Sequence, residues 1–207
     1  ASIDYFGRWK ALHYAEKRFF APVLLSCCEE GTLTQRTNIN DELREDAVEK
    51  SIRLNVSNET MQPVRCEVRW ALRNAKGEAL LEGGEEVAVD ALSAKWLEKH
   101  EFPSADLYGD YASYELWSDG VKVSSGTVLF CAPKHFHFVD PQLSLTVEGD
   151  EIVVSAKAYA RMVEIVCEDG DVLFDDNYFD LNADSRRIRI LRGKGTKFSV
   201  RSVYDIR

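Results

Sequence analysis

The 207-residue sequence has no long hydrophobic run and no segment typical of protein targeting. No apolar stretch approaches the roughly 20 residues that a transmembrane helix needs. The first residues do not show the basic, apolar and small-residue order of a secretory signal. We therefore expect no contact with a membrane. A signal that belongs to a longer chain would lie upstream of Ala1.

The sequence also lacks the short motifs of common catalytic and nucleotide-binding sites. It contains no GxGxxG, no Walker pattern and no GxSxG that would position a nucleophilic serine. His135 and His137 would project from one face of a strand, but no third metal ligand follows nearby. Carboxylates are numerous, yet a single sequence does not pair them. We therefore predict no catalytic residue, no metal and no cofactor in this chain.

Cysteines are few and odd in number, and none is in a CxxC pair. The five are Cys27, Cys28, Cys66, Cys131 and Cys167. This pattern does not indicate a zinc site or a disulfide framework, so we expect free thiols and a reducing compartment, which favours the cytoplasm. Two sequons, at Asn55 and Asn58, point the other way, because glycosylation occurs in secreted proteins.

Positive charge is in deficit, with 26 Lys and Arg against 35 Asp and Glu and a formal net charge of −9. This balance argues against nucleic acid as a partner. Acidic residues between 41 and 49 indicate a solvated loop or short helix face. Basic residues gather from Arg186 to the C-terminus, where we expect an exposed sheet face or, as the alternative, a surface that docks on an acidic neighbouring domain.

The N-terminal stretch from Ser2 to Phe20 is rich in aromatic residues. Apolar positions recur there at three- and four-residue spacing, which predicts one helix with a broad aromatic stripe. Ser2 would cap this helix, Asp4 would lie at its positive end, and Pro22 would end it. A stripe this aromatic needs a large apolar surface opposite it.

Beyond Val23 the pattern changes from helical to alternating. "VRCEVRWAL", residues 64–72, places apolar residues on one side and Arg65, Glu67 and Arg69 on the other, as in an antiparallel strand with one wet face. Turns at Asp119-Gly120, Gly149-Asp150 and Asp169-Gly170 predict hairpins. Short, evenly spaced strands with polar turns indicate an all-β fold of two immunoglobulin-like antiparallel β-sandwiches.

The boundary between the sandwiches is predicted at "CAPKHFHFVDPQ", residues 131–142, where two prolines bracket an extended stretch. Trp96, Trp117 and Tyr111 are candidates for exposed aromatics that stack on sugar rings. Packing in a core or an interface is the interpretation that we favour for them, with sugar stacking as the alternative.

Two stretches together resemble a known family. "DYFGRWKALHYAEKRFFAPVLLS", residues 4–26, resembles the end of the catalytic barrel in β-mannosidases of glycoside hydrolase family 2. "DDNYFDLNADSRRIRI", residues 175–190, resembles the "DNYFDL" stretch of their C-terminal immunoglobulin-like domain. The sequence departs from the family after this motif, where Asn182-Ala183-Asp184 replaces the usual Pro-Gly turn.

The resemblance implies three parts. Residues 1–20 would be the terminal helix of a catalytic barrel that is absent here, 21–133 a mannosidase Ig/CBM-like sandwich and 139–207 a C-terminal Ig-like sandwich. The parent enzyme would perform retaining hydrolysis of terminal β-mannosides with two glutamates upstream, so this chain alone would be inactive. Its partners would be that barrel and, as a further candidate, carbohydrate. The alternative is a free-standing carbohydrate-binding or adhesion module.

Five residues are candidates for sugar contact or for a domain interface: Trp9, Trp96, Trp117, Asn177 and Tyr178. In "DDNYFDL" the first three residues suit a tight turn, whereas Phe179 and Leu181 share the parity of a strand face that enters the core. This corner would either specify the fold or act as a lid that reaches toward a sugar. We favour the structural interpretation because burial of a Phe and a Leu contributes about 2 kcal/mol each.

Overall fold

The computed structural model of the chain describes residues 1–29 and 48–206, so the acidic positions 41–46 lie outside the described residues. The chain forms two compact units. One unit comprises Phe20–Ala75 and Ala79–His137, and the other comprises Ala1–Phe19, Lys76–Glu78 and Phe138–Arg207. No helix in the described parts is long and apolar enough to cross a bilayer.

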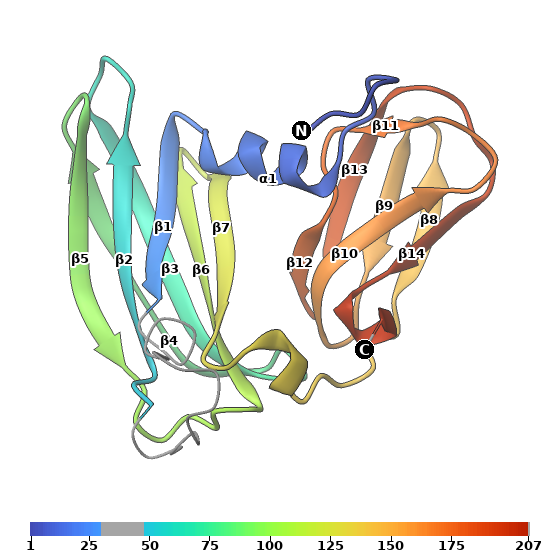
Figure 1. The fold of residues 1–207 in the computed structure, drawn as a ribbon. Coiled ribbons are helices and arrows are strands. Elements are labelled where there is room, and N and C mark those ends of the chain that lie inside the picture. The colour runs from blue at the N-terminus through green and yellow to red at the C-terminus, as the bar shows by residue number, and fades with distance from the viewer. Residues whose placement is uncertain (30–47, 207) are drawn as a thin grey trace. The chain divides into compact units, whose positions relative to one another are not determined.

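The first unit is an antiparallel sandwich of a three-stranded sheet, β1-β2-β5, and a four-stranded sheet, β4-β3-β6-β7 (Figure 1). Its strands are β1 (Val23–Glu29), β2 (Ser51–Asn58), β3 (Val64–Asn74), β4 (Ala79–Val89), β5 (Ser93–Glu101), β6 (Asp110–Ser118) and β7 (Val121–Leu129), followed by the short helix η2 (Pro133–His135).

The alternating pattern determines which side of each strand is buried in this unit. Cys66 and Val68 of β3 lie in the core, whereas Arg65, Glu67 and Arg69 are exposed, which confirms the expected wet face. Alternation also buries Leu54 and other apolar residues of β2 in the facing sheet. The predicted hairpin at Asp119-Gly120 is confirmed, with both residues at positive φ as a two-residue type I′ turn requires. Tyr111 is fully buried, so it packs in the core, as favoured for these aromatics, and presents no face to a sugar.

The second unit is also an antiparallel sandwich, with sheets β12-β10-β14 and β11-β13-β9-β8. Its elements are α1 (Ala11–Phe19), β8 (Ser144–Glu148), β9 (Glu151–Ser155), β10 (Tyr159–Cys167), β11 (Leu173–Phe174), β12 (Phe179–Asn182), β13 (Ser185–Arg192), β14 (Phe198–Arg201) and η3 (Val203–Ile206). Phe179 and Leu181 alternate into its core beside Ile152, Val163 and Ile188, as the corner sequence predicts. Over residues 1–29 and 48–206 the fold is thus all-β with one α-helix near the N-terminus.

The turn predictions in the second unit divide into one success and one error. Gly149 has a φ of 69° and joins β8 to β9 in the predicted hairpin. The hairpin predicted at Asp169-Gly170 is wrong, because β10 pairs with β12 and β14 whereas β11 pairs with β13. The Asp169 carboxylate accepts hydrogen bonds from the backbone N–H groups of Thr196 and Lys197. This turn therefore binds the segment before β14 and directs the chain into the other sheet.

The N-terminal segment forms a shorter helix than the sequence predicts. The helix α1 begins at Ala11, so the predicted helical roles of Ser2 and Asp4 are wrong. The Asp4 carboxylate instead accepts the backbone N–H groups of Phe6 and Arg8, both at 2.9 Å, and Gly7 has a φ of 80°. Aspartate competes with helix formation through such local bonds. A tight loop closed by a bridge between Ile3 and Trp9 is the result.

All five cysteines are thiols that take part in no disulfide. Cys66 and Cys131 are buried, and Cys27, Cys28 and Cys167 are partly exposed. Cysteine here behaves as a small apolar residue of strands and strand ends.

Candidate functional site

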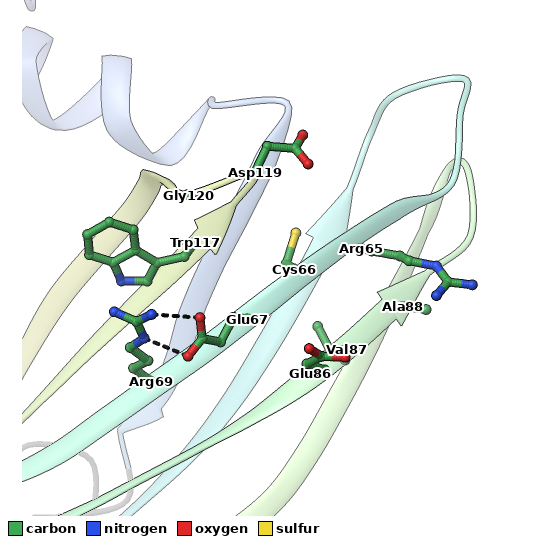
Figure 2. A pocket seen from close by; sticks show the side chains of 10 residues that line it. All are labelled: Arg65, Cys66, Glu67, Arg69, Glu86, Val87, Ala88, Trp117, Asp119 and Gly120. Carbon is green, nitrogen blue, oxygen red and sulfur yellow. Dashed lines mark hydrogen bonds and ion pairs between the residues drawn. The ribbon is translucent and has the colours of Figure 1, made fainter.

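A hollow of about 400 Å³ opens at the four-stranded sheet of the first unit. It is lined by residues of β3, β4 and β6 and by the turn that follows β6 (Figure 2). The volume lies within the range of small-molecule pockets in proteins. Among the five residues singled out from the sequence, Trp117 is the one that lines this hollow.

Strand register gathers the polar side chains of this site on one face. Glu67 of β3 lies opposite Glu86 of β4 on one side and Trp117 of β6 on the other, and Trp117 in turn lies opposite Lys122 of β7. Residues that are directly opposite in antiparallel strands have side chains about 5 Å apart on the same face. The row therefore presents two carboxylates, an indole and an ammonium side by side.

Glu67 of this row forms a bidentate ion pair with Arg69, two residues further along β3. Nε and Nη2 of Arg69 donate to the two carboxylate oxygens of Glu67, each at 2.7 Å, as the dashed lines in Figure 2 show. The hydrogen bonds from Arg69 lower the pKa of Glu67, and the pair raises the pKa of Arg69. Both groups are therefore charged at neutral pH.

The indole of Trp117 is held by one hydrogen bond and two neighbouring cations. Its Nε1–H donates to Glu115 at 2.9 Å, and the guanidinium carbon of Arg69 lies 4.8 Å from the ring centroid. Lys122 Nζ donates to the other oxygen of Glu115 at 3.0 Å and lies 5.9 Å from the same ring. These contacts fix the orientation of the indole before any ligand arrives.

A second hollow, of about 460 Å³, lies on the same sheet and shares Glu67 and Arg69 with the first. Gly84 of β4 lies opposite Arg69 and lines this second hollow. A Cβ atom at Gly84 would lie 2.7 Å from the carbonyl oxygen of Val68, so a side chain would force the backbone to move. The missing side chain leaves space beside the ion pair.

The chemistry of these hollows suits recognition better than catalysis. Cys66 lines the first hollow, but burial raises the pKa of its thiol and keeps it protonated at neutral pH. The charged groups beside it are paired or open to solvent rather than desolvated. Residues 1–29 and 48–206 contain no group of three or more His, Cys, Asp or Glu residues arranged to hold a metal ion.

The other candidate residues do not line this hollow. Trp96 lies on β5, in the other sheet of the sandwich, where it is 53% exposed and the guanidinium of Arg53 lies 5.2 Å from its ring. Trp9 precedes α1 and packs against His13 and Tyr14 with ring centroids 4.4 and 5.4 Å apart. Within the first unit, Trp96 and Trp117 thus lie on different sheets, and Trp9 belongs to the second unit.

Asn177 and Tyr178 belong to the corner before β12. Asn177 is buried, and its amide accepts the N–H of Ile165 at 2.8 Å and donates to the C=O of Ile165 at 3.0 Å. The hydroxyl of Tyr178 donates to Glu164 at 2.7 Å. Burial and this bond raise the pKa of Tyr178 above its usual range. The side-chain polar groups of Asn177 and Tyr178 therefore make their hydrogen bonds within the domain.

The same corner anchors α1. The guanidinium of Arg18 donates to the Asp176 carboxylate at 2.5 Å and to the carbonyl oxygens of Asn177 and Tyr178, each at 3.0 Å. The rings of Tyr14 and Tyr178 lie 5.9 Å apart, and Tyr14 is buried. The helix is therefore docked on the C-terminal sandwich along one side.

Sequence reasoning missed Glu67, Arg69 and Glu86 as site residues. It placed Glu67 and Arg69 on a wet strand face, but it did not know which strands flank β3. The signal that locates them is strand register, because only pairing brings Trp117 beside Glu67 and Arg69.

Two family models match the chain in succession. The Mannosidase Ig/CBM-like domain model matches residues 50–135, and the Ig-fold domain model of mannosidases matches residues 138–206. No curated protein sequence matches the chain significantly.

A β-D-mannosidase and an exo-chitosanase are among the solved structures with a similar fold. A β-D-mannosidase from Dictyoglomus thermophilum is 14% identical with a TM-score of 0.72, over 98% of this chain and 24% of that chain. The exo-chitosanase CsxA of Amycolatopsis orientalis is 16% identical with a TM-score of 0.53, over 96% of this chain and 27% of that chain. The chain therefore spans about a quarter of the length of these structures. It belongs to the mannosidase Ig/CBM-like domain family over residues 50–135 and to the mannosidase Ig-fold domain family over residues 138–206.

Proposed function

We propose that this chain is the non-catalytic accessory region of a β-mannosidase-type glycoside hydrolase of family 2. The observation that carries the proposal is the succession of two mannosidase domain families on one chain, at residues 50–135 and 138–206. The likeness of fold to a β-mannosidase structure four times as long supports it.

The N-terminal segment supports an attachment to a further domain. One side of α1 is docked through Tyr14 and Arg18, whereas Tyr5 and Phe6 in the loop before it are 96% and 69% exposed. Exposure of large adjacent aromatic side chains is unfavourable in water and is typical of interaction surfaces. In our proposal the catalytic barrel of the same polypeptide covers Tyr5 and Phe6, and residues 1–20 are the end of that barrel.

The parent reaction would be retaining hydrolysis of a terminal β-mannoside. Such a reaction needs one carboxylic acid that protonates the leaving oxygen and one carboxylate, about 5 Å away, that attacks the anomeric carbon. In our proposal both glutamates lie upstream of Ala1. The accessory domains then contribute stability and surface rather than reacting groups.

The test is the coding sequence immediately upstream of the codon for Ala1. The proposal expects an open reading frame in the same phase that encodes a (β/α) barrel with two glutamates at the ends of its strands. A start codon or a signal peptide directly before Ala1 would contradict it.

The alternative is a free-standing carbohydrate-binding or adhesion module, and the hollow beside Trp117 is the observation that favours it. The same upstream sequence separates the two proposals. A module of this kind would be preceded by a leader or by another binding domain, without a barrel.

A further inference from the structure

We propose that the hollow beside Trp117 is a carbohydrate-binding site that takes a neutral oligosaccharide of pyranose units. The site lies on the first sandwich, and the proposal does not depend on the catalytic barrel. It goes beyond the accessory role because it assigns a ligand to a surface within the Ig/CBM-like domain.

The indole of Trp117 supplies a platform for a sugar ring. The face of an aromatic ring carries partial negative charge and attracts the weakly positive C–H groups of a pyranose. Its bond to Glu115 and the guanidinium of Arg69, which lies over the ring at 4.8 Å, hold the partly exposed ring in one orientation, so a sugar would stack on the face away from Arg69. A fixed platform loses little conformational entropy when a ligand binds.

Two further side chains at the hollow are available to hydroxyl groups. Arg65 and Glu86 line it and form no side-chain hydrogen bond or ion pair with another described residue. A guanidinium and a carboxylate each present two polar atoms in one plane, which matches a pair of adjacent sugar hydroxyls. Because one donates and the other accepts, the pair can satisfy both functions of a hydroxyl.

The charge balance of the site favours a neutral ligand. The three cations Arg65, Arg69 and Lys122 stand beside the carboxylates of Glu67, Glu86, Glu115 and Asp119. Mixed charges of nearly equal number give no strong field for a phosphate or a polyanion. A ligand with many hydroxyls and no net charge fits this surface best.

The size of the site indicates more than one sugar unit. The two hollows, of about 400 and 460 Å³, meet at the Glu67–Arg69 pair. The bare backbone at Gly84 keeps the second hollow open. A short oligosaccharide would therefore lie on the sheet with one ring on Trp117 and the next beyond the ion pair.

The experiment uses two-dimensional ¹H–¹⁵N spectra of the full chain, in which each of the four tryptophans contributes one indole N–H. The Trp117→Phe variant assigns one signal. Manno-, cello- and xylo-pentaose are each added to about 10 mM, tenfold above a Kd of about 1 mM. We expect at least one of them to shift the Trp117 indole signal and to leave the Trp96 signal in place. Inorganic phosphate should shift neither signal.

Two tryptophan variants test whether the sugar binds at Trp117. Trp117→Ala should weaken binding at least tenfold, and Trp96→Ala, which removes an exposed tryptophan from the other sheet, should leave it unchanged. If Trp117→Ala does not fold, Ala88→Tyr replaces it, because Ala88 is exposed and its larger substitute fills the hollow. No shift with any of the three sugars, a shift with phosphate, or equal loss in the two tryptophan variants would overturn the proposal.

Discussion

The corner at residues 175–181 and the hollow beside Trp117 contain the same kinds of side chain, but they use them differently. In the corner the Asp176 carboxylate lies between Arg18 and Arg186, at 2.5 and 2.6 Å, and the Asn177 amide bonds both backbone groups of Ile165. In the hollow Arg65 and Glu86 have no such partner among the described residues.

This difference shows how to distinguish structural from binding surfaces among similar residues. A polar group whose hydrogen bonds are all made inside the protein adds stability and has nothing left for a ligand. A fixed aromatic ring beside unpaired, solvated charges keeps its capacity for a ligand. The corner is therefore expected to affect stability, and the hollow is expected to affect binding.

The largest expected effect comes from Phe179→Ala in the core behind the corner. Phe179 is 3% exposed, and the loss of a buried phenyl group costs about 3–5 kcal/mol. For a domain of this size we expect the melting temperature to fall by more than about 10 °C, as measured by thermal denaturation. Leu191→Ala is the control, since Leu191 of the same domain is 49% exposed and should matter little. Unchanged stability, together with lower activity of a longer parent enzyme, would make the corner a lid instead.

Asn177→Ala should have the next largest effect. It leaves the N–H and C=O of Ile165 without their side-chain partner in a buried site, which costs about 1–3 kcal/mol. Asn177→Asp keeps an acceptor for the N–H but loses the donor to the C=O. Chemical denaturation should therefore give the highest free energy of unfolding for the wild type, a lower one for Asn177→Asp, and one as low or lower for Asn177→Ala. A neutral effect of Asn177→Ala would show that water replaces the amide, which contradicts the account of the corner.

Arg18→Ala should release α1 from the corner at a smaller cost, about 1 kcal/mol, because the ion pair is partly exposed. The more sensitive readout is chymotryptic cleavage at Trp9 and Tyr14, which should become faster. Lys10→Ala changes an exposed residue directly before α1 and serves as the control. If both variants are cleaved at the wild-type rate, Arg18 does not hold the helix.

The smallest effect concerns pH and the other domain. Burial lowers the pKa of His100, against the partial opposition of Glu85 and Glu98. The imidazole therefore binds a proton more readily in the unfolded chain than in the folded one. Its contribution to the free energy of unfolding is complete above about pH 6.5 and is lost as the pH falls through the lowered pKa. His100→Phe keeps the ring that packs 4.3 Å from Trp70 and should flatten the pH dependence of unfolding between about pH 7.5 and 5. An equal slope in both proteins would assign the effect to other groups.

Local patterns were sufficient for part of the fold. Alternation in β3, the hairpin at Asp119-Gly120 and the burial of Phe179 and Leu181 follow from neighbouring residues alone. The helix start at Ala11 was missed because the Asp4 carboxylate outcompetes a helical first turn. Asp169 was misread because its bonds reach residues 196 and 197, which only the folded chain brings near.

The candidate site was less predictable than the fold. Trp117 could be named as an aromatic of a sheet, but its relation to Glu67, Arg69 and Lys122 depends on which strands pair and in which register. For the same reason the sequence did not distinguish Trp96 from Trp117. Both follow similar strand patterns, but they lie on different sheets of the first unit. Strand order and register depend on contacts between residues far apart in the sequence, and local patterns in a single sequence do not predict them.

The most direct measurement of the accessory role compares two purified proteins with aryl β-mannosides as substrates. One is residues 1–207 alone, and the other is the longer polypeptide that the proposal expects from a reading frame continuous with the codon for Ala1. The account predicts turnover by the longer protein and none by the isolated chain, since both reacting carboxyl groups would lie upstream. Turnover that stays with residues 1–207 through repurification, or a longer protein that contains no glycosidase activity, would contradict it.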